Sequence, residues 1–402
     1  MSAPRRYATW LIAIVALTSL ASFVLNTTVN PWRVTPYPWS SEKADPYRDI
    51  SSQIRTAKAG LVRSNPDTRI AVFGSSRVAN GLDPEDDRWP HDQVLNLGCS
   101  GGFIYESVAM ARYAMEHLPL ELAIIGIDPG DLGSDLDTRP MGDFHASPLA
   151  GADPNSELRY VIGISTAEES FQTLKRQSHD FLPQYNPVGL RVRSHKAPGK
   201  PQIAFIREQI TGEAEFGLTT TGRDENELNA EKVAGLQALL HDARAKGIRM
   251  IVYFHPTHAL RYLRASDAEN PALLFENERR ALLKMVDQAN QAPNNGPAIT
   301  LWDFADAHLL NSDPLPDEAS MMTHWTDLDH YTVEVGSLML ARMLDWELRM
   351  DAGEDYGQRI DRESQSTWFE QVRKSSSAYV SGKGTRDIKW KEELIGQSAP
   401  AP

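Results

Sequence analysis

The sequence predicts an open α/β fold with a parallel sheet, joined to one N-terminal membrane-spanning helix. Three observations lead to this prediction. Short apolar runs alternate with longer segments of helical periodicity, the runs are apolar at nearly every position, and the first 30 residues contain a long uncharged stretch. Strands that are buried on both faces read as continuous apolar runs, which is typical of a parallel sheet covered by helices.

The N-terminal segment has the composition of a membrane-spanning helix. A basic pair, Arg5 and Arg6, precedes a stretch without charge before Arg33, and residues 10–25 of this stretch are almost all apolar. With its flanks, the stretch reaches the ~20 residues that cross a bilayer, and the basic pair predicts a cytoplasmic N-terminus. We therefore expect a single-pass inner-membrane protein with residues 1–30 as stub and anchor and the soluble part in the periplasm. The alternative is a signal peptide that is cleaved after Ala21, which ends a small-x-small triplet.

The strands of the sheet are expected at five short apolar runs. These follow a linker and helical segment over residues 31–68, of which residues 47–63 have helical character. The runs are residues 69–74, 93–97, 122–128, 248–254 and 298–303. Their length favours strands over buried helices.

Helices are expected between and after these strands, over residues 105–116, 229–246, 275–292 and 333–350. The best-marked one begins at Asn229, which is a favoured N-cap residue, and stops before Gly247, a favoured C-cap glycine. The alternation of strand and helix predicts a flavodoxin-like three-layer α/β/α sandwich. Right-handed crossovers would place the carboxyl ends of the parallel strands along one edge of the sheet, where ligands bind.

We expect the domain to span residues 69–350. Two regions depart from the alternation of strand and helix, one within this domain and one after it. Residues 131–220 form a long insertion, rich in Pro and Gly, that we expect to cap or shape the site. Residues 351–402 are polar, and we expect a mobile tail without a core of its own, with at most one short docked helix around Trp368, Phe369 and Val372.

The amino-acid composition limits the kinds of binding partner that we expect. The formal net charge is −13, from 41 basic and 54 acidic residues. An acidic surface repels phosphate backbones, so we expect no nucleic-acid partner. The single cysteine, Cys99, excludes an intrachain disulfide, and its small neighbours indicate a packed residue rather than a reactive thiol.

The residues that follow the strands, or precede the last helix, carry the chemistry of acyl transfer. Ser75 and Ser76 follow the first strand, a glycine-rich turn that begins at Gly98 follows the second, and an Asp-x-x-His block spans Asp327 to His330. A serine hydroxyl needs a base to remove its proton, a histidine suits this task near neutral pH, and a carboxylate orients the histidine. Backbone N–H groups in glycine turns can stabilise the oxyanion.

In this order of motifs the sequence resembles the SGNH/GDSL-like hydrolase superfamily. The Gly-Ser-Ser-Arg block, the Asn-Leu-Gly-x-Ser-Gly-Gly block and the Asp-x-x-His block carry the resemblance, which runs from about residue 69 to 346 without most of the insertion. It is similar to a divergent membrane-anchored bacterial branch related to polysaccharide O-acetyltransferases. The resemblance implies Ser76 as nucleophile, His330 as base, Asp327 as its orienting acid and Gly98 as an oxyanion donor, with no cofactor.

One position departs from the family pattern. The family places an asparagine that donates to the oxyanion after the third strand, and this chain has Asp128 there. A carboxylate would repel the developing charge unless it is protonated or neutralised by a cation such as Arg77. Either the oxyanion hole is rebuilt from backbone N–H groups with Asn80 or Arg77, or hydrolase activity is lost. Arg77 itself either binds an anionic substrate group or pairs with Asp128, and we favour the pairing.

The remaining polar and aromatic residues near the strand ends are open to two interpretations each. We expect His255 or His258 to line the substrate pocket, and a metal site at this pair is the alternative that we do not favour. Trp325 and Tyr331 flank the acid–histidine block, where they either stack on a sugar or pack in the core.

Two functions remain in view. The first is a serine esterase or O-acyltransferase that acts on an acylated glycan or small ester outside the cytoplasm, with a cell-envelope polysaccharide as the expected substrate. The second is a non-catalytic scaffold that binds glycans or partners in an envelope assembly. A phosphodiesterase is disfavoured by the acidic balance.

Overall fold

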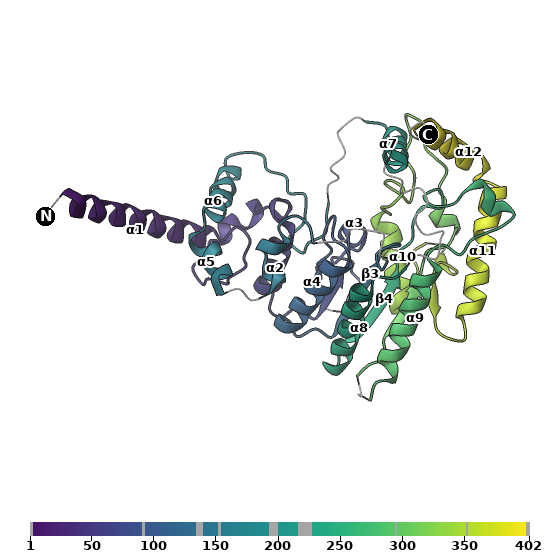
Figure 1. Ribbon diagram of the computed structural model, residues 1–402, viewed down its shortest axis with the longest axis horizontal. Helices are drawn as coiled ribbons and strands as arrows, with labels where there is room; N and C mark the ends of the chain where they lie inside the picture. Colours follow the sequence, from purple (N-terminus) through teal and green to yellow (C-terminus); the bar gives the residue numbers. More distant parts are fainter. Residues whose placement is uncertain are drawn as a thin grey trace.

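The computed structural model describes residues 3–90, 93–133, 140–151, 154–192, 200–215, 227–293, 296–350 and 353–398. It is a mixed α/β structure around one six-stranded sheet of order β2-β1-β3-β4-β5-β6 (Figure 1). The strands are β1 (Ile70–Phe73), β2 (Val94–Asn96), β3 (Leu122–Ile127), β4 (Arg249–Phe254), β5 (Thr300–Asp303) and β6 (Gln358–Ile360). The first five run parallel, as predicted, and β6, which was not predicted, pairs antiparallel with β5.

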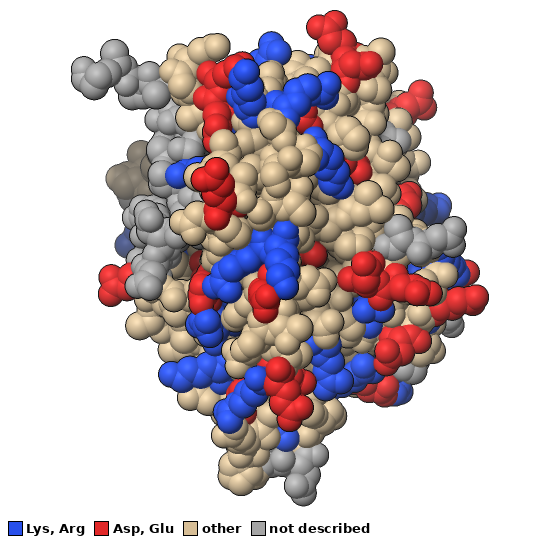
Figure 2. Space-filling view, turned by 90° about the vertical axis from the view of Figure 1, so that its right-hand side faces the viewer, with Lys and Arg blue, Asp and Glu red and all other residues tan. Residues whose placement is uncertain are grey.

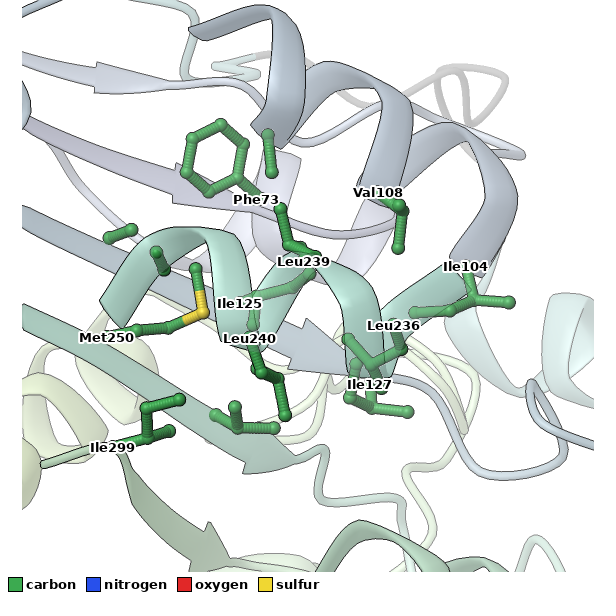
Figure 3. Close-up of a cluster of buried hydrophobic side chains, with 14 of the residues drawn as sticks. Phe73, Ile104, Val108, Ile125, Ile127, Leu236, Leu239, Leu240, Met250 and Ile299 are labelled. Atoms are coloured by element: carbon green, nitrogen blue, oxygen red, sulfur yellow. The ribbon is translucent and has the colours of Figure 1, made fainter. Parts of the chain in front are cut away.

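Helices cover both faces of the sheet because successive side chains of the strands point to opposite sides. Phe73, Ile125 and Met250 belong to one apolar core, which Figure 3 shows beneath α8 (Ala230–Ala245). The same core includes residues of α2 (Ile54–Ser64), α4 (Ile104–His117) and α9 (Glu276–Gln291). Ile70, Val72 and Ile124 belong to the second core, with α3 (Ser76–Gly81) and α10 (Val333–Leu344).

The helix boundaries follow local capping chemistry. The Asn229 side chain accepts hydrogen bonds from the N–H groups of Glu231 and Lys232, and Gly247 ends the helix with a φ of +73°, so both predicted caps are confirmed. The stretch over residues 47–63, predicted to have helical character, is helical in separate pieces rather than as one continuous helix. The Asp49 side chain instead accepts from the Ser51 N–H in a short 3₁₀ turn, and α2 begins only at Ile54.

Helix α1 (Ala3–Val29) is long and apolar enough to span a membrane, and it projects away from the domain (Figure 1). Only its last turns are buried, against α5 (Pro154–Ile162) and α6 (Ile164–Arg176). The Asn26 amide donates to the carbonyl oxygens of Val161 and Gly163 at 3.1 and 3.2 Å. The described part of this first half of the insertion therefore holds α1.

The second half of the insertion does reach the predicted site. Helix α7 (Gln202–Glu215) packs against α12 (Thr385–Ser398) and against the acid–histidine block. The Gln202 amide donates to the Trp325 carbonyl at 2.8 Å. Residues 134–139, 152–153, 193–199 and 216–220 of the insertion lie outside the described residues.

The prediction of a mobile C-terminal tail is wrong for residues 353–398. This segment adds β6 to the sheet and forms α11 (Gln365–Ser381) and α12. Trp368, Phe369 and Val372 are buried and recur at helical spacing, so a polar composition conceals one apolar face. The Trp368 indole N–H also donates to an Asp303 carboxylate oxygen at 3.0 Å, which joins α11 to β5. Residues 351–352 and 399–402 lie outside the described residues.

Candidate active site

Ser76 is the first residue of α3, directly beyond the carboxyl end of β1. Gly74 makes the sharp turn between them, with a φ of +150° and the Val78 side chain only 2.5 Å from where a Cβ would lie. Ser75 is the N-cap, and its hydroxyl accepts the Arg77 N–H at 3.2 Å. The turn and the cap hold Ser76 at the sheet edge, where its side chain is only partly buried.

The predicted relay of serine, histidine and aspartate is brought together. The Ser76 hydroxyl lies 2.8 Å from His330 Nε2. The opposite ring nitrogen, His330 Nδ1, lies 2.9 and 2.8 Å from the two carboxylate oxygens of Asp327. These distances are those of hydrogen bonds, and their order is the one that nucleophile activation requires.

Asp327 is fixed by the backbone of its own loop. Its Oδ1 accepts the N–H groups of Asp329 and His330, both at 2.8 Å. Burial raises the pKa of Asp327, but the hydrogen bond and charge of His330 outweigh this effect, so the pKa lies below its ordinary value. The group is therefore a carboxylate that stabilises a positive imidazole ring.

A backbone β-bridge between Trp325 and Tyr331 closes the loop that carries Asp327 and His330. Both side chains are buried in the core, so of the two interpretations of these aromatics, core packing is the correct one. Tyr331 also packs against Gly81 of α3, where an added Cβ would lie 2.1 Å from its ring. This contact sets the loop of His330 against the helix of Ser76.

Arg77 lies behind this relay in a buried ionic cluster. Its guanidinium is 3.1 Å from Asp128 Oδ1 and 2.7 Å from Asp329 Oδ1. Arg261 adds a contact of 3.0 Å to Asp329 Oδ1, and the Gln209 amide of α7 donates to Asp329 Oδ2 at 2.6 Å. Burial lowers the pKa of Arg77, but Asp128 and Asp329 together raise it above its ordinary value.

Arg77 and Asp128, two candidate substrate-binding residues, contact each other. Burial raises the pKa of Asp128, but Arg77, His255 and the Ser75 hydroxyl outweigh it and hold the pKa below its ordinary value. Asp128 is thus a charged carboxylate rather than a protonated acid, and the positive charge of Arg77 balances its negative charge. The favoured pairing of Arg77 with Asp128 is confirmed.

The expectation that His255 or His258 lines a substrate pocket is wrong. Both rings are fully buried, and burial lowers the pKa of His255 to about 3 and that of His258 to about 4. His255 lies between the Tyr331 hydroxyl at 3.3 Å and Asp128 Oδ1 at 3.5 Å. His258 Nδ1 accepts the Leu260 N–H at 3.2 Å, and its Nε2 contacts the Asp313 carbonyl at 2.9 Å. Both are neutral structural residues.

Gly98 has a packing role instead of the predicted oxyanion role. Its N–H is donated to the Asn96 side chain at 3.0 Å, and a Cβ at this position would lie 2.7 Å from the Ala79 backbone nitrogen. The Asn96 amide in turn donates to the carbonyl oxygens of Val78 in α3 and of Leu82 directly after it, at 2.7 and 2.8 Å. Sequence reasoning missed this residue, although an asparagine that ends a buried apolar run is a signal for such a brace.

Sequence reasoning singled out Gly98 and overlooked Gly101, a second glycine of the same turn. The pairing of the second strand with the first extends to the Cys99 N–H, which donates to the Gly74 carbonyl at 2.9 Å. A turn closed by Gly102 N–H and the Cys99 carbonyl then exposes Gly101, which has a φ of +66°. The Gly-Gly pair of the Asn-Leu-Gly-x-Ser-Gly-Gly block could have indicated this turn, since a left-handed turn position favours glycine. Asn80 is partly exposed on α3, one turn after Ser76 and on the same helical face.

No model of a known protein family matches the chain, and no curated protein is similar to it. Across the described ranges, no group of three or more His, Cys, Asp or Glu side chains is placed to hold a metal ion.

Proposed function

We propose that the chain is a serine esterase or O-acyltransferase of the SGNH type, with Ser76 as its nucleophile. The observation that carries this proposal is the continuous hydrogen-bonded path from the Ser76 hydroxyl through both nitrogens of His330 to Asp327. Each contact lies within hydrogen-bond reach without any movement of the protein. Asp327 and His330 come from one loop and Ser76 from a helix more than 250 positions away.

The proposed first step transfers an acyl group to the protein. The Ser76 Oγ attacks the ester carbonyl, and His330 Nε2 takes the hydroxyl proton. The Asp327 carboxylate stabilises the imidazolium that forms. The same proton is then given to the leaving alkoxide, which departs as an alcohol. In the second step, water or an acceptor hydroxyl loses a proton to His330 and attacks the acyl-serine. The bond to Ser76 Oγ breaks, an acid or a new ester is released, and His330 returns the proton to Ser76 Oγ.

We assign the oxyanion contacts to backbone N–H groups. The N–H of Ser76 lies at the start of α3, and the exposed Gly101 N–H lies in the turn that follows β2 at the same sheet edge. Asn80 supplies a side-chain donor on the Ser76 face of the helix. Arg77 neutralises Asp128, and this pairing supports activity despite the carboxylate in the asparagine position.

Our proposals on family, fold, location and substrate follow from the resemblance in the sequence motifs. We infer an SGNH-like relationship and a flavodoxin-like three-layer sandwich, supported by the strand order 2-1-3-4-5 and by apolar cores on both sheet faces. With α1 as an inner-membrane anchor, the domain would face the periplasm. An acylated cell-envelope polysaccharide or a small ester is the substrate that this location favours.

Covalent labelling tests the central claim. We would treat the full-length chain with a fluorophosphonate and measure intact mass, beside Ser76→Ala and the remote control Ser64→Ala. We expect a single adduct on Ser76 in the parent and the control, and none in Ser76→Ala. No adduct in the parent, when a control esterase labels fully, would reject an activated serine.

The competing proposal is a non-catalytic scaffold that binds glycans, and the ionised Asp128 is the observation that favours it. The two proposals separate on one pair of measurements. Glycan binding that survives Ser76→Ala, with no turnover by either chain, would favour the scaffold. Turnover of an aryl acetate or of glycan acetyl groups that is lost in Ser76→Ala, with binding retained, would favour the enzyme.

A further inference from the structure

A cavity of about 580 Å³ lies at the foot of α1, away from Ser76. Its wall is mainly apolar and includes Trp32, Leu61, Phe181 and Tyr185. This volume is in the range of cavities that hold small molecules, and its lining suits a hydrocarbon rather than a polar ligand. The relay of Ser76 uses none of these residues.

The position of the cavity relates it to the bilayer. Its lining begins at Pro31, directly after α1 ends at Val29. Arg48 fixes this arrangement, because its guanidinium donates to the carbonyl oxygens of Val29 and Asn30 at 2.7 and 2.9 Å. If α1 crosses a membrane, the cavity lies at the level of the lipid headgroups.

The surface beside the cavity is apolar as well. Ile164 and Phe171 of α6 are 87% and 62% exposed, and Leu182, next to the lining residue Phe181, is 60% exposed. Helices α5 and α6 lie at the end of the domain from which α1 projects (Figure 1). Figure 2 shows the opposite end of the molecule, which faces away from α1, and there basic and acidic side chains are spread over much of the surface. Exposed apolar side chains next to an anchor suit contact with lipid.

We propose that this cavity binds a hydrocarbon chain of an anionic membrane lipid. The charges near it favour an anionic headgroup, because two arginines, Arg33 and Arg48, share one carboxylate, Asp45. Arg33 lies 2.5 Å from Asp45 and keeps 26% of its side chain exposed, so it can meet a phosphate. The proposal rests on α1 as a membrane span and is independent of the proposed esterase function.

The cavity also touches the turn that we assign to the oxyanion. The Tyr185 ring forms part of its wall, and the Tyr185 hydroxyl lies 3.0 Å from the Ser100 hydroxyl, next to Gly101. A bound chain would therefore pack against the residue that supports the glycine turn. Lipid occupancy would restrain this turn from the side opposite to solvent.

Photolabelling of the full-length chain tests the proposal. The chain is placed in vesicles of phosphatidylcholine and phosphatidylglycerol that contain phosphatidylglycerol with a diazirine in its acyl chain, and adducts are mapped after irradiation. Trp32 and Tyr185 are 5% and 4% exposed, so adducts on them report occupancy of the cavity. Adducts on exposed Trp39, on Leu182 and on α1 report ordinary contact with the bilayer and serve as internal controls.

Two variants are designed to exclude lipid from the cavity, one by the volume of its side chain and the other by its charge. Ala57→Trp fills it from α2, and Phe181→Asp places a charge in the wall at a partly exposed position that tolerates polarity. We expect either variant to reduce labelling of Trp32 and Tyr185 by about tenfold or more and to leave the control adducts unchanged. The second variant gives the answer if the first does not fold.

Three outcomes would overturn the proposal. Labelled α1 and Leu182 with unlabelled Trp32 and Tyr185 in the parent would show that lipid does not enter the cavity. Labelling of Trp32 and Tyr185 that persists in both variants would place the lipid elsewhere. Equal labelling by a phosphatidylcholine probe would remove the preference for an anionic headgroup.

Discussion

Two groups of polar side chains lie next to each other at the carboxyl edge of the sheet, and both contain aspartate. One is the relay of Ser76, His330 and Asp327, with His330 25% exposed. The other is the ionic cluster of Arg77, Asp128 and Asp329, with Arg77 only 7% exposed. The first group can exchange protons with a substrate, whereas the charges of the second are fixed by burial and pairing.

The difference shows that the identity of a residue does not determine its role. Asp327 and Asp329 are two positions apart, yet Asp327 contacts the imidazole and Asp329 contacts two arginines. His330 contacts a hydroxyl at the surface, whereas His255 is buried and neutral. Partner and exposure decide which groups take part in chemistry and which hold the loops in place. The following predictions test this division.

The largest effect is expected from Asp327→Asn. The amide oxygen can still accept the backbone N–H groups of Asp329 and His330, so the loop keeps its shape. Its NH₂ cannot accept from His330 Nδ1, so the ring loses the partner that stabilises its charged form. We expect turnover of an aryl acetate to fall by about 10³–10⁴-fold, with an unchanged unfolding midpoint. Activity within a few-fold of the parent would remove Asp327 from the relay.

A large effect on stability is expected from Arg77→Met. This change removes the cation that Asp128 and Asp329 share and leaves Asp128 without an arginine partner, whereas Asp329 keeps its contact with Arg261. Breaking a buried pair in this way costs about 3–5 kcal/mol of the free energy of unfolding. The measurement is urea unfolding followed by circular dichroism.

The matched control for Arg77 is Arg69→Met. Arg69 also pairs with a carboxylate, Glu121, but both side chains are about half exposed. Surface pairs contribute about 0–1 kcal/mol, so the two substitutions should differ severalfold in their cost. Equal losses would contradict the assignment of Arg77 to a buried structural cluster.

An intermediate effect that depends on pH is expected from His255→Gln. Burial lowers the pKa of His255 from 6.5 to about 3, so the unfolded chain takes up the proton first as the pH falls. The stability that the neutral ring contributes is present above pH 6.5 and is lost below it. We expect the difference in unfolding free energy, parent minus variant, to decrease by up to about 1.4 kcal/mol per pH unit between pH 6.5 and 4.

The difference between the two chains is the informative quantity. Glu278 and Asp306 have pKa values that burial raises to about 7, and they titrate in the same range with the opposite slope. Their contribution is common to both chains and cancels. A difference that does not change with pH would show that His255 is protonated in the fold or reaches solvent.

The smallest effect is expected from Asp128→Asn. This change removes a negative charge near the proposed oxyanion site and keeps an oxygen that accepts from Arg77 and Ser75. We expect kcat/KM for an aryl acetate to rise by about threefold to tenfold, together with a modest loss of stability. A fall in kcat/KM without unfolding would assign the Asp128 carboxylate a direct part in the site.

Much of the fold could be predicted because its signals are local. Five apolar runs became the five parallel strands, and Asn229 and Gly247 capped the helix that they were expected to cap. The C-terminal segment was predicted only in part, as one short docked helix, because a helix such as α11 needs just one apolar face. That helix contacts β6 and β5, and β5 is distant from it in the sequence.

From the amino-acid sequence we could predict the order of the five parallel strands, a helix able to span a membrane, and the three residues of the relay. A short motif such as Asp-x-x-His carries its geometry within one loop, so spacing was enough to identify Asp327 and His330. The packed fold was needed to show that His255 also faces Asp128 and that the Gly98 N–H donates to the Asn96 side chain. These roles depend on burial and on partners from other strands, and both arise only when the chain packs.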